Sequence, residues 1–82
     1  MSAISAHALA DGLAQAHWTH LDLWLAAIAV GGALTATDIV DLTTGHRDAT
    51  AIEHDILAVA LNDHFVALNQ DHPVPYWHEL PT

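Results

Sequence analysis

The segments Thr19-His20-Leu21-Asp22, Thr35-Ala36-Thr37-Asp38 and Thr50-Ala51-Ile52-Glu53 decide the fold, since each places an acidic residue three positions after a threonine. In such a capping box the threonine hydroxyl accepts the amide hydrogen of the acidic residue, whose carboxylate accepts the amide hydrogen of the threonine. The acid also lies favourably at the positive end of the helix. The three boxes therefore predict helices that begin at residues 20, 36 and 51.

Stop signals follow each of these starts. Gly31-Gly32 and Gly45 are suited to the left-handed conformation that ends a helix. Pro73 prevents the third helix from continuing beyond about residue 71. Together the starts and stops predict helices over 20–30, 36–44 and 51–69.

A further helix is predicted over 3–16, where Ile4, Leu9 and Leu13 form a thin apolar stripe. We therefore expect a single all-α domain over residues 1–82, a small three- to four-helix bundle with an extended C-terminal tail over 71–82. A short helix, a loop and a longer helix also resemble a helix-turn-helix tri-helical core in shape. We expect no DNA binding from it.

The charge of the chain excludes several classes of function. Arg47 is the only basic residue beside ten acidic ones, for a net charge of −9, and there is no lysine. Binding to nucleic acid and to anionic membranes both depend on Lys and Arg, so we expect neither partner. The longest uncharged apolar stretch, 23–34, is shorter than the ~20 residues that a membrane span needs. We expect a cytoplasmic protein.

The eight histidines raise the question of a metal site. His17 and His20 are spaced as HxxH, but Thr19 as a cap places His17 outside the helix. His54 and His64 do not converge on one side of their helix. There is no cysteine to supply a thiolate ligand. We expect no metal and no cofactor, with histidine-based metal binding kept as a further alternative.

The sequence contains no recognisable set of catalytic residues. Neighbouring histidine and acidic residues, such as Asp63 and His64, face different ways on a helix. There is no glycine-rich phosphate loop, and so short a chain has little room for an enclosed pocket. We expect no catalytic residues and a protein that is not an enzyme.

The predicted helix over 51–69 has two apolar sectors on nearly opposite sides. One sector contains Ile52, Ile56, Val59 and Val66. Either the helix is central and covered on both sides, or one sector is a surface for a partner or a second copy. The candidate partner or self-association face is the other sector: Leu57, Leu61, Phe65 and Leu68.

The C-terminal tail combines prolines with large apolar residues. The prolines favour an extended backbone, and the apolar side chains of the tail can be buried against another surface. Folding back over the core near Trp18 and Trp24 is the favoured interpretation, and docking into a groove of a partner is the alternative. The candidate docking residues are Pro73, Pro75, Tyr76, Trp77 and Leu80.

Most of the histidines are expected at the surface, where their protonation between pH 6.5 and 5 would reduce the negative charge and the solubility while helicity persists. His64, between Leu61, Phe65 and Leu68, is the best candidate for a buried histidine.

Three stretches carry a resemblance to other proteins: THLDLWLA at 19–26, ALNDHF at 60–65 and DHPVPY at 71–76. With the lysine-free, aspartate-rich composition, they resemble uncharacterised small acidic proteins of actinobacteria and their bacteriophages. This resemblance implies a phage accessory protein that binds a host protein and disables or redirects it. No catalytic motif comes with it.

These observations favour a non-enzymatic protein–protein interaction module whose partner is a host protein with a basic surface. The alternative is a homo-oligomeric structural protein, such as a homodimer formed through the candidate face on the helix over 51–69.

Overall fold

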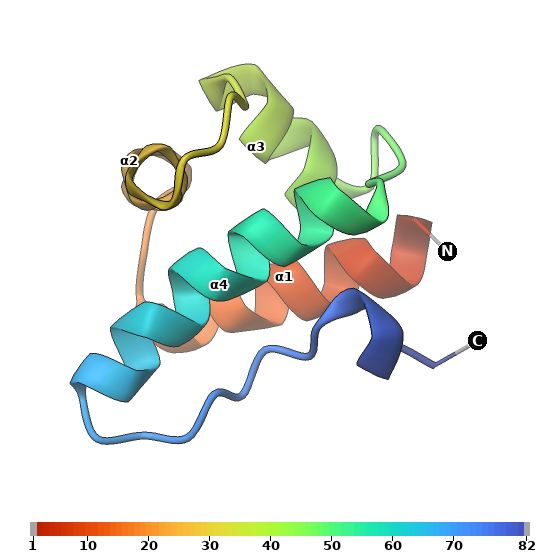
Figure 1. Ribbon diagram of the computed structural model, residues 1–82. Helices are drawn as coiled ribbons and strands as arrows, with labels where there is room; N and C mark the ends of the chain where they lie inside the picture. Colours follow the sequence, from red (N-terminus) through yellow and green to blue (C-terminus); the bar gives the residue numbers. More distant parts are fainter. Residues whose placement is uncertain (1, 82) are drawn as a thin grey trace.

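The computed structural model describes residues 2–81, and all of its regular structure there is helical. Met1 and Thr82, the ends of the predicted domain, lie outside the described residues. The all-α prediction is confirmed, and the predicted N-terminal helix is present. The elements are α1 (Ser2–Ala16), α2 (His20–Val30), α3 (Ala36–Thr44), α4 (Ala51–Ala67) and a short 3-10 helix, η1 (Trp77–Glu79) (Figure 1).

All three predicted capping boxes form at the starts of α2, α3 and α4. The amide of Thr35, for example, donates to Asp38 Oδ2 at 2.8 Å, and the amide of Asp38 donates to Thr35 Oγ1 at 3.1 Å. Gly31 and Gly45 end α2 and α3 with φ values of 106° and 82°. The local signals therefore position the middle of the chain as predicted.

Helix α4 ends two residues earlier than the predicted boundary at 69. Asn69 has a φ of 60°, and the amide of Gln70 donates back to the carbonyl of Phe65 at 2.9 Å. Asn69 thus takes the left-handed position that glycine usually occupies after a helix. His17, with a φ of 55°, has the same role after α1, where the amide of Trp18 donates to the carbonyl of Leu13.

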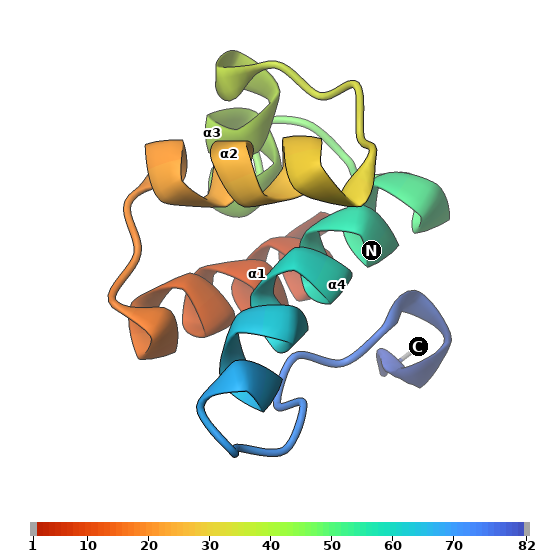
Figure 2. The ribbon, with the colours of Figure 1, turned by 60° about the vertical axis from the view of Figure 1, so that its left-hand side comes forward.

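The helices pack around the pair formed by α1 and α4, which run side by side in the same direction (Figures 1 and 2). Helices α2 and α3 cover one side of this pair, and the C-terminal segment covers the opposite side. Helices α3 and α4 pack on α1 and α2 and have few contacts with each other. The similarity to a helix-turn-helix core is therefore limited to the order of the elements.

The core lies along the sector of α4 that was predicted to bind a partner. Leu57, Leu61 and Phe65 are buried among Leu9, Leu23, Ile39 and Leu42. Only Leu68, beyond the end of α4, is exposed. The predicted partner or self-association face is therefore wrong. Helices α1 and α2 pack against α4, and Leu57, Leu61 and Phe65 fill the space between α4 and these two helices.

The other apolar sector of α4 is the more exposed one. Ile52 and Val66 are exposed by 74% and 57%, whereas Ile56 and Val59 are half-buried. Helix α4 is therefore central, which was the first of the two interpretations of its apolar pattern. The sector with Leu57, Leu61 and Phe65 is buried, whereas the opposite sector is covered only in part.

Candidate functional site

The C-terminal tail folds back onto the chain through polar contacts with α4. We call residues 73–81 the strap. Val74 is buried, and the Asn62 side chain forms hydrogen bonds with both its carbonyl and its amide. Asn62 Nδ2 donates to the Val74 carbonyl at 2.9 Å, and the Val74 amide donates to Asn62 Oδ1 at 3.0 Å. Asp55 Oδ1 accepts the amide hydrogen of Trp77 at 2.8 Å. The favoured interpretation, fold-back, matches this arrangement.

The strap does not lie where the sequence placed it. The Trp18 ring lies against the His64 ring at a tilted angle, with ring centroids 4.6 Å apart, and Trp24 Nε1 donates to the Leu34 carbonyl at 2.9 Å. Helix α2, which carries Trp24, and the strap are on opposite sides of α1 and α4 (Figure 2). The predicted location near Trp18 and Trp24 is therefore wrong.

The predicted docking residues of the strap are engaged in the fold itself. The Leu80 side chain is buried, and Tyr76 and Trp77 are half-buried against the core. Pro73 and Pro75 flank the buried Val74. The strap is docked on its own chain, so the structure contradicts the alternative that these residues dock into a groove of a partner.

His54 is the buried histidine of the structure, whereas His64 is only half-buried. His54 Nε2 is 2.9 Å from the Pro75 carbonyl, which can only accept, so this nitrogen carries the hydrogen. In the neutral ring, Nδ1 then accepts from the Ser5 hydroxyl at 2.7 Å. The prediction that His64 is the buried one is wrong.

A hydrogen-bonded serine and histidine can form a nucleophilic pair in an enzyme. Here Ser5 and His54 are both fully buried, and neither lines the pocket between α1 and the C-terminal segment or the groove between α2 and α4. Their geometry joins the N-terminal helix to the strap through α4. The sequence analysis did not pair them because they are 49 residues apart, although His54 precedes Leu57 and Leu61 at i, i+3, i+7 spacing.

The structure brings no metal ligands together in the part that it describes. No group of three or more His, Asp or Glu side chains there is arranged to hold an ion. His20 instead bonds Thr43 Oγ1 at 3.1 Å, and His72 lies 3.0 Å from Asp71. The histidines are dispersed over the fold.

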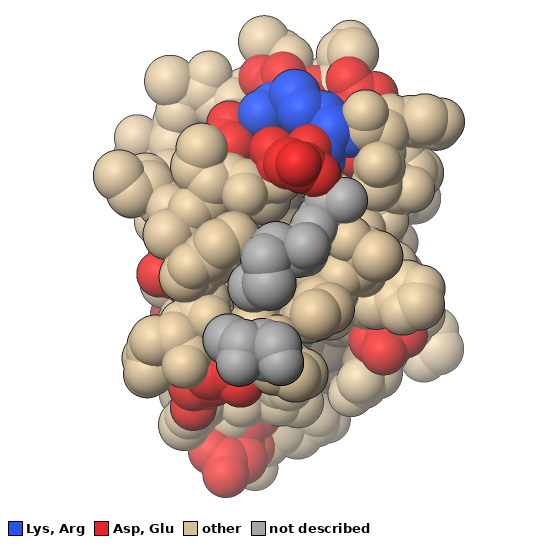
Figure 3. Space-filling view, turned by 90° about the vertical axis from the view of Figure 1, so that its right-hand side faces the viewer, with Lys and Arg blue, Asp and Glu red and all other residues tan. Residues whose placement is uncertain are grey.

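The single arginine is fully engaged with carboxylates (Figure 3). Arg47 Nη1 donates to both oxygens of Glu53, at 3.1 and 3.0 Å, and Nη2 lies 3.3 Å from Asp38. Hydrogen bonding from the Thr35 amide, aided by Arg47, lowers the pKa of Asp38. Burial opposes a lower pKa at Glu53, but the Thr50 amide and Arg47 outweigh it and lower that pKa too. The surface is left with carboxylates and no uncommitted Lys or Arg.

The most prominent apolar surface is on α2. Leu21, Leu25 and Ile28 are 55%, 54% and 48% exposed and follow one another at i, i+4 and i+7, which places them on one side of the helix. We call these three residues the α2 stripe. Leu23 and Ala27, on the opposite side of α2, are buried in the core. Apolar residues occupy both sides of α2, and their order in the sequence does not indicate which side faces outward.

A shallow groove of about 560 Å³ lies between α2 and α4, and none of the residues of the α2 stripe lines it. Most of the side chains in its walls are small and apolar, and α4 contributes the Asp63 carboxylate and the His64 ring. The groove is lined by Trp18, Ala26, Ala29, Val30, Val59, Ala60, Asp63 and His64.

No helix in the described part of the chain is both long and apolar enough to cross a membrane. In the comparisons with known proteins, no family model, curated protein or solved structure matches this chain. The case for a function therefore depends on the surface described above.

Proposed function

We propose that this chain is a non-enzymatic protein-binding module that docks on another protein through the α2 stripe. The observation that supports this is the exposure of three large aliphatic side chains in register on a helix whose other side is buried. An i, i+4, i+7 set of apolar anchors is what a helix presents when it docks in a groove of a partner. Each side chain is about half exposed, so its burial contributes about 1 kcal/mol.

The charge of the chain indicates the chemistry of the partner. Asp22 on α2 and Asp63 beside the groove are exposed, and Arg47 is paired with two carboxylates. A partner with an apolar groove and a basic rim would be attracted to this surface, and the rate of encounter would fall with salt. On the resemblance to phage and actinobacterial proteins, we propose a host protein in the bacterial cytoplasm.

A second copy of the chain is a less suitable occupant. Each copy has a net charge of −9, so two copies repel each other, and the one arginine is already neutralised. Size-exclusion chromatography with light scattering at tens of micromolar is expected to show a monomer. A stable dimer that Leu25→Asp dissociates would replace this proposal with self-association through the α2 stripe.

Affinity capture from an actinobacterial lysate with matched variants tests the proposal. Leu25→Asp puts a charge in the α2 stripe, and Ile52→Asp makes the same change at a more exposed residue of α4. An acid is favourable at position 52, in the first turn of α4. We expect one specific protein to be captured at low salt by the wild type and Ile52→Asp but not by Leu25→Asp. Equal capture by all three, with circular dichroism unchanged, would refute docking through the stripe.

A further inference from the structure

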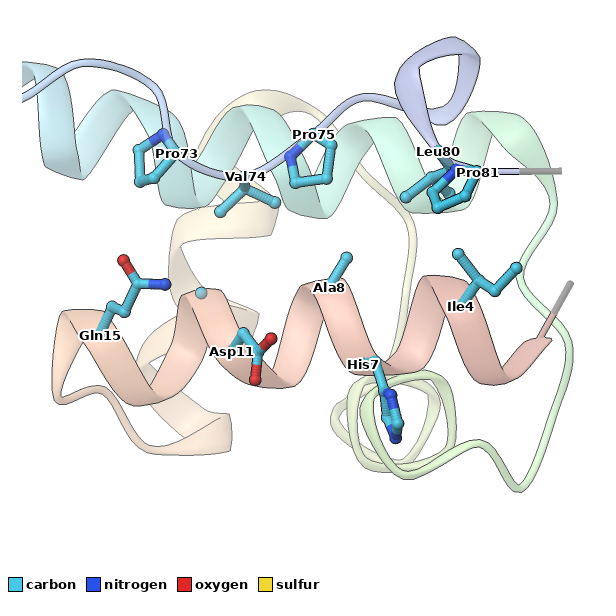
Figure 4. A pocket seen from close by; sticks show the side chains of 11 residues that line it. Ile4, His7, Ala8, Asp11, Gln15, Pro73, Val74, Pro75, Leu80 and Pro81 are labelled. Atoms are coloured by element: carbon cyan, nitrogen blue, oxygen red, sulfur yellow. The ribbon is translucent and has the colours of Figure 1, made fainter.

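A second candidate site lies between α1 and the strap, on the side of the molecule away from α2 (Figures 2 and 4). The pocket has a volume of about 400 Å³. Ile4 and Ala8 point from α1 toward the strap, which runs antiparallel to the helix (Figure 4). Leu80 and Pro81 face Ile4 at one end. This volume is within the range of small-molecule sites, about 300–1,000 Å³.

The walls of the pocket are stiff. All three prolines of the chain, Pro73, Pro75 and Pro81, line it, and each has a fixed φ. Asn62 and His54 hold the strap between them through the hydrogen bonds at Val74 and Pro75. A site whose walls are already ordered loses little conformational entropy when it binds a ligand.

Gly12 allows α1 and the strap to meet closely. A Cβ atom at position 12 would lie 2.6 Å from Val74 Cγ2, closer than any side chain tolerates, so glycine is required for this contact. The backbone of α1 and the Val74 side chain thus form the floor of the pocket beside its apolar walls.

One carboxylate provides the charge of the pocket. Asp11 lines it, is exposed, and makes no hydrogen bond or ion pair with another described residue. Gln15 adds a neutral amide, and the His7 ring points away from the strap (Figure 4). No Lys or Arg lines the pocket, since Arg47 is held by Asp38 and Glu53 elsewhere.

We propose that this pocket binds a small apolar molecule that carries a positively charged amine. The apolar part lies between Ile4, Ala8 and the prolines of the strap, and the ammonium group lies at the Asp11 carboxylate. The net charge of −9 raises the local concentration of cations and repels anions of the same size. This site is separate from the α2 stripe and does not depend on the function proposed for it.

Amide chemical-shift titrations of the full chain with three probes of similar shape test the site: phenethylamine, phenethyl alcohol and phenylacetate. We expect phenethylamine to give saturable shifts at Ala8, Gly12, Val74 and Leu80. The alcohol should bind more weakly and phenylacetate should give no shifts there. Absence of shifts with phenethylamine, or equal binding of the amine and the alcohol, would overturn the proposal.

Two charge-matched variants separate a specific ion pair from general attraction. Asp11→Asn should weaken phenethylamine binding about fivefold, the upper end for an exposed ion pair. Asp48→Asn removes the same charge from an exposed loop outside the pocket and should leave binding unchanged. Equal weakening by both would mean that only the net charge attracts the amine. Ala8→Phe, which fills the pocket, should abolish the shifts, and the amide spectrum reports whether each variant is folded.

Discussion

Asn62→Ala should destabilise the chain strongly, because Asn62 fastens the strap from a buried position. Its side chain is 2% exposed and pairs with both the amide and the carbonyl of Val74. Alanine would leave these two backbone groups buried without partners, at a cost of about 1–3 kcal/mol each. If the strap undocks in this variant, water can bond the Val74 amide and carbonyl, which limits the loss of stability. We therefore expect the free energy of unfolding to fall by about 2–4 kcal/mol.

Such a loss is large for a chain of this length. At ~0.05–0.15 kcal/mol per residue, the total stability is roughly 4–12 kcal/mol. In small domains 1 kcal/mol corresponds to about 4–8 °C in melting temperature, so we expect a decrease of roughly 10–30 °C.

Urea unfolding followed by circular dichroism measures the loss, and hydrogen exchange of the Val74 amide reports on the strap itself. Val74 lies between two prolines, so its amide is an isolated reporter. Gln70→Ala, which removes an exposed amide side chain, is the matched control and should change stability by less than about 0.5 kcal/mol. Asn62→Ala with wild-type stability and a protected Val74 amide would refute the assigned role of these hydrogen bonds.

Three further outcomes follow from the fold. Leu61→Ala should cost about 2–5 kcal/mol in urea unfolding and Leu25→Ala less than about 0.5, since Leu61 is buried and Leu25 is exposed; similar costs would contradict the core assignment. Thr35→Ala should cost about 1 kcal/mol through its capping box, whereas Thr37→Ala should not. The pKa values of Asp38 and Glu53 lie below their ordinary values of 3.8 and 4.5, so their stabilisation is present above these values and is lost as pH falls through the lower folded pKa values. Arg47→Gln should make the loss of stability between pH 7 and about pH 3 smaller, and an unchanged urea-midpoint profile would contradict this.

The helices could be predicted because their signals are local. A capping box joins residues three positions apart, and glycine adopts a positive φ without steric cost, so both are readable along the chain. The ends of α1 and α4 were less readable, since His17 and Asn69 adopt the left-handed conformation without being glycine. Composition alone does not distinguish such residues from ordinary helical ones.

The faces of the helices could not be assigned in the same way. Helix α4 is apolar on both sides, and its contacts with α1, α2 and the strap decide which side is buried. The predicted partner face consists of Leu57, Leu61, Phe65 and Leu68, and the first three of these form part of the core. The exposed surface is on α2, whose two sides also differ little in composition. Tertiary packing, not local propensity, selects between such sides.

The histidines show the same limit. His54 and His64 are both on α4 between apolar residues, yet only His54 faces Ser5 and the Pro75 carbonyl. Those partners are 49 and 21 residues away in the sequence, beyond the reach of a local pattern. The expected decrease in solubility between pH 6.5 and 5 stays a prediction.

Site-specific photo-crosslinking tests docking through the α2 stripe most directly. A photoreactive phenylalanine analogue is placed at position 25 in one variant and at position 52 in the other, both exposed in the free chain. After irradiation in cells of the proposed actinobacterial host, we expect a discrete adduct with one other protein from position 25 and none from position 52. An adduct from position 52 alone, or none from position 25, would contradict the proposal that α2 carries the binding surface.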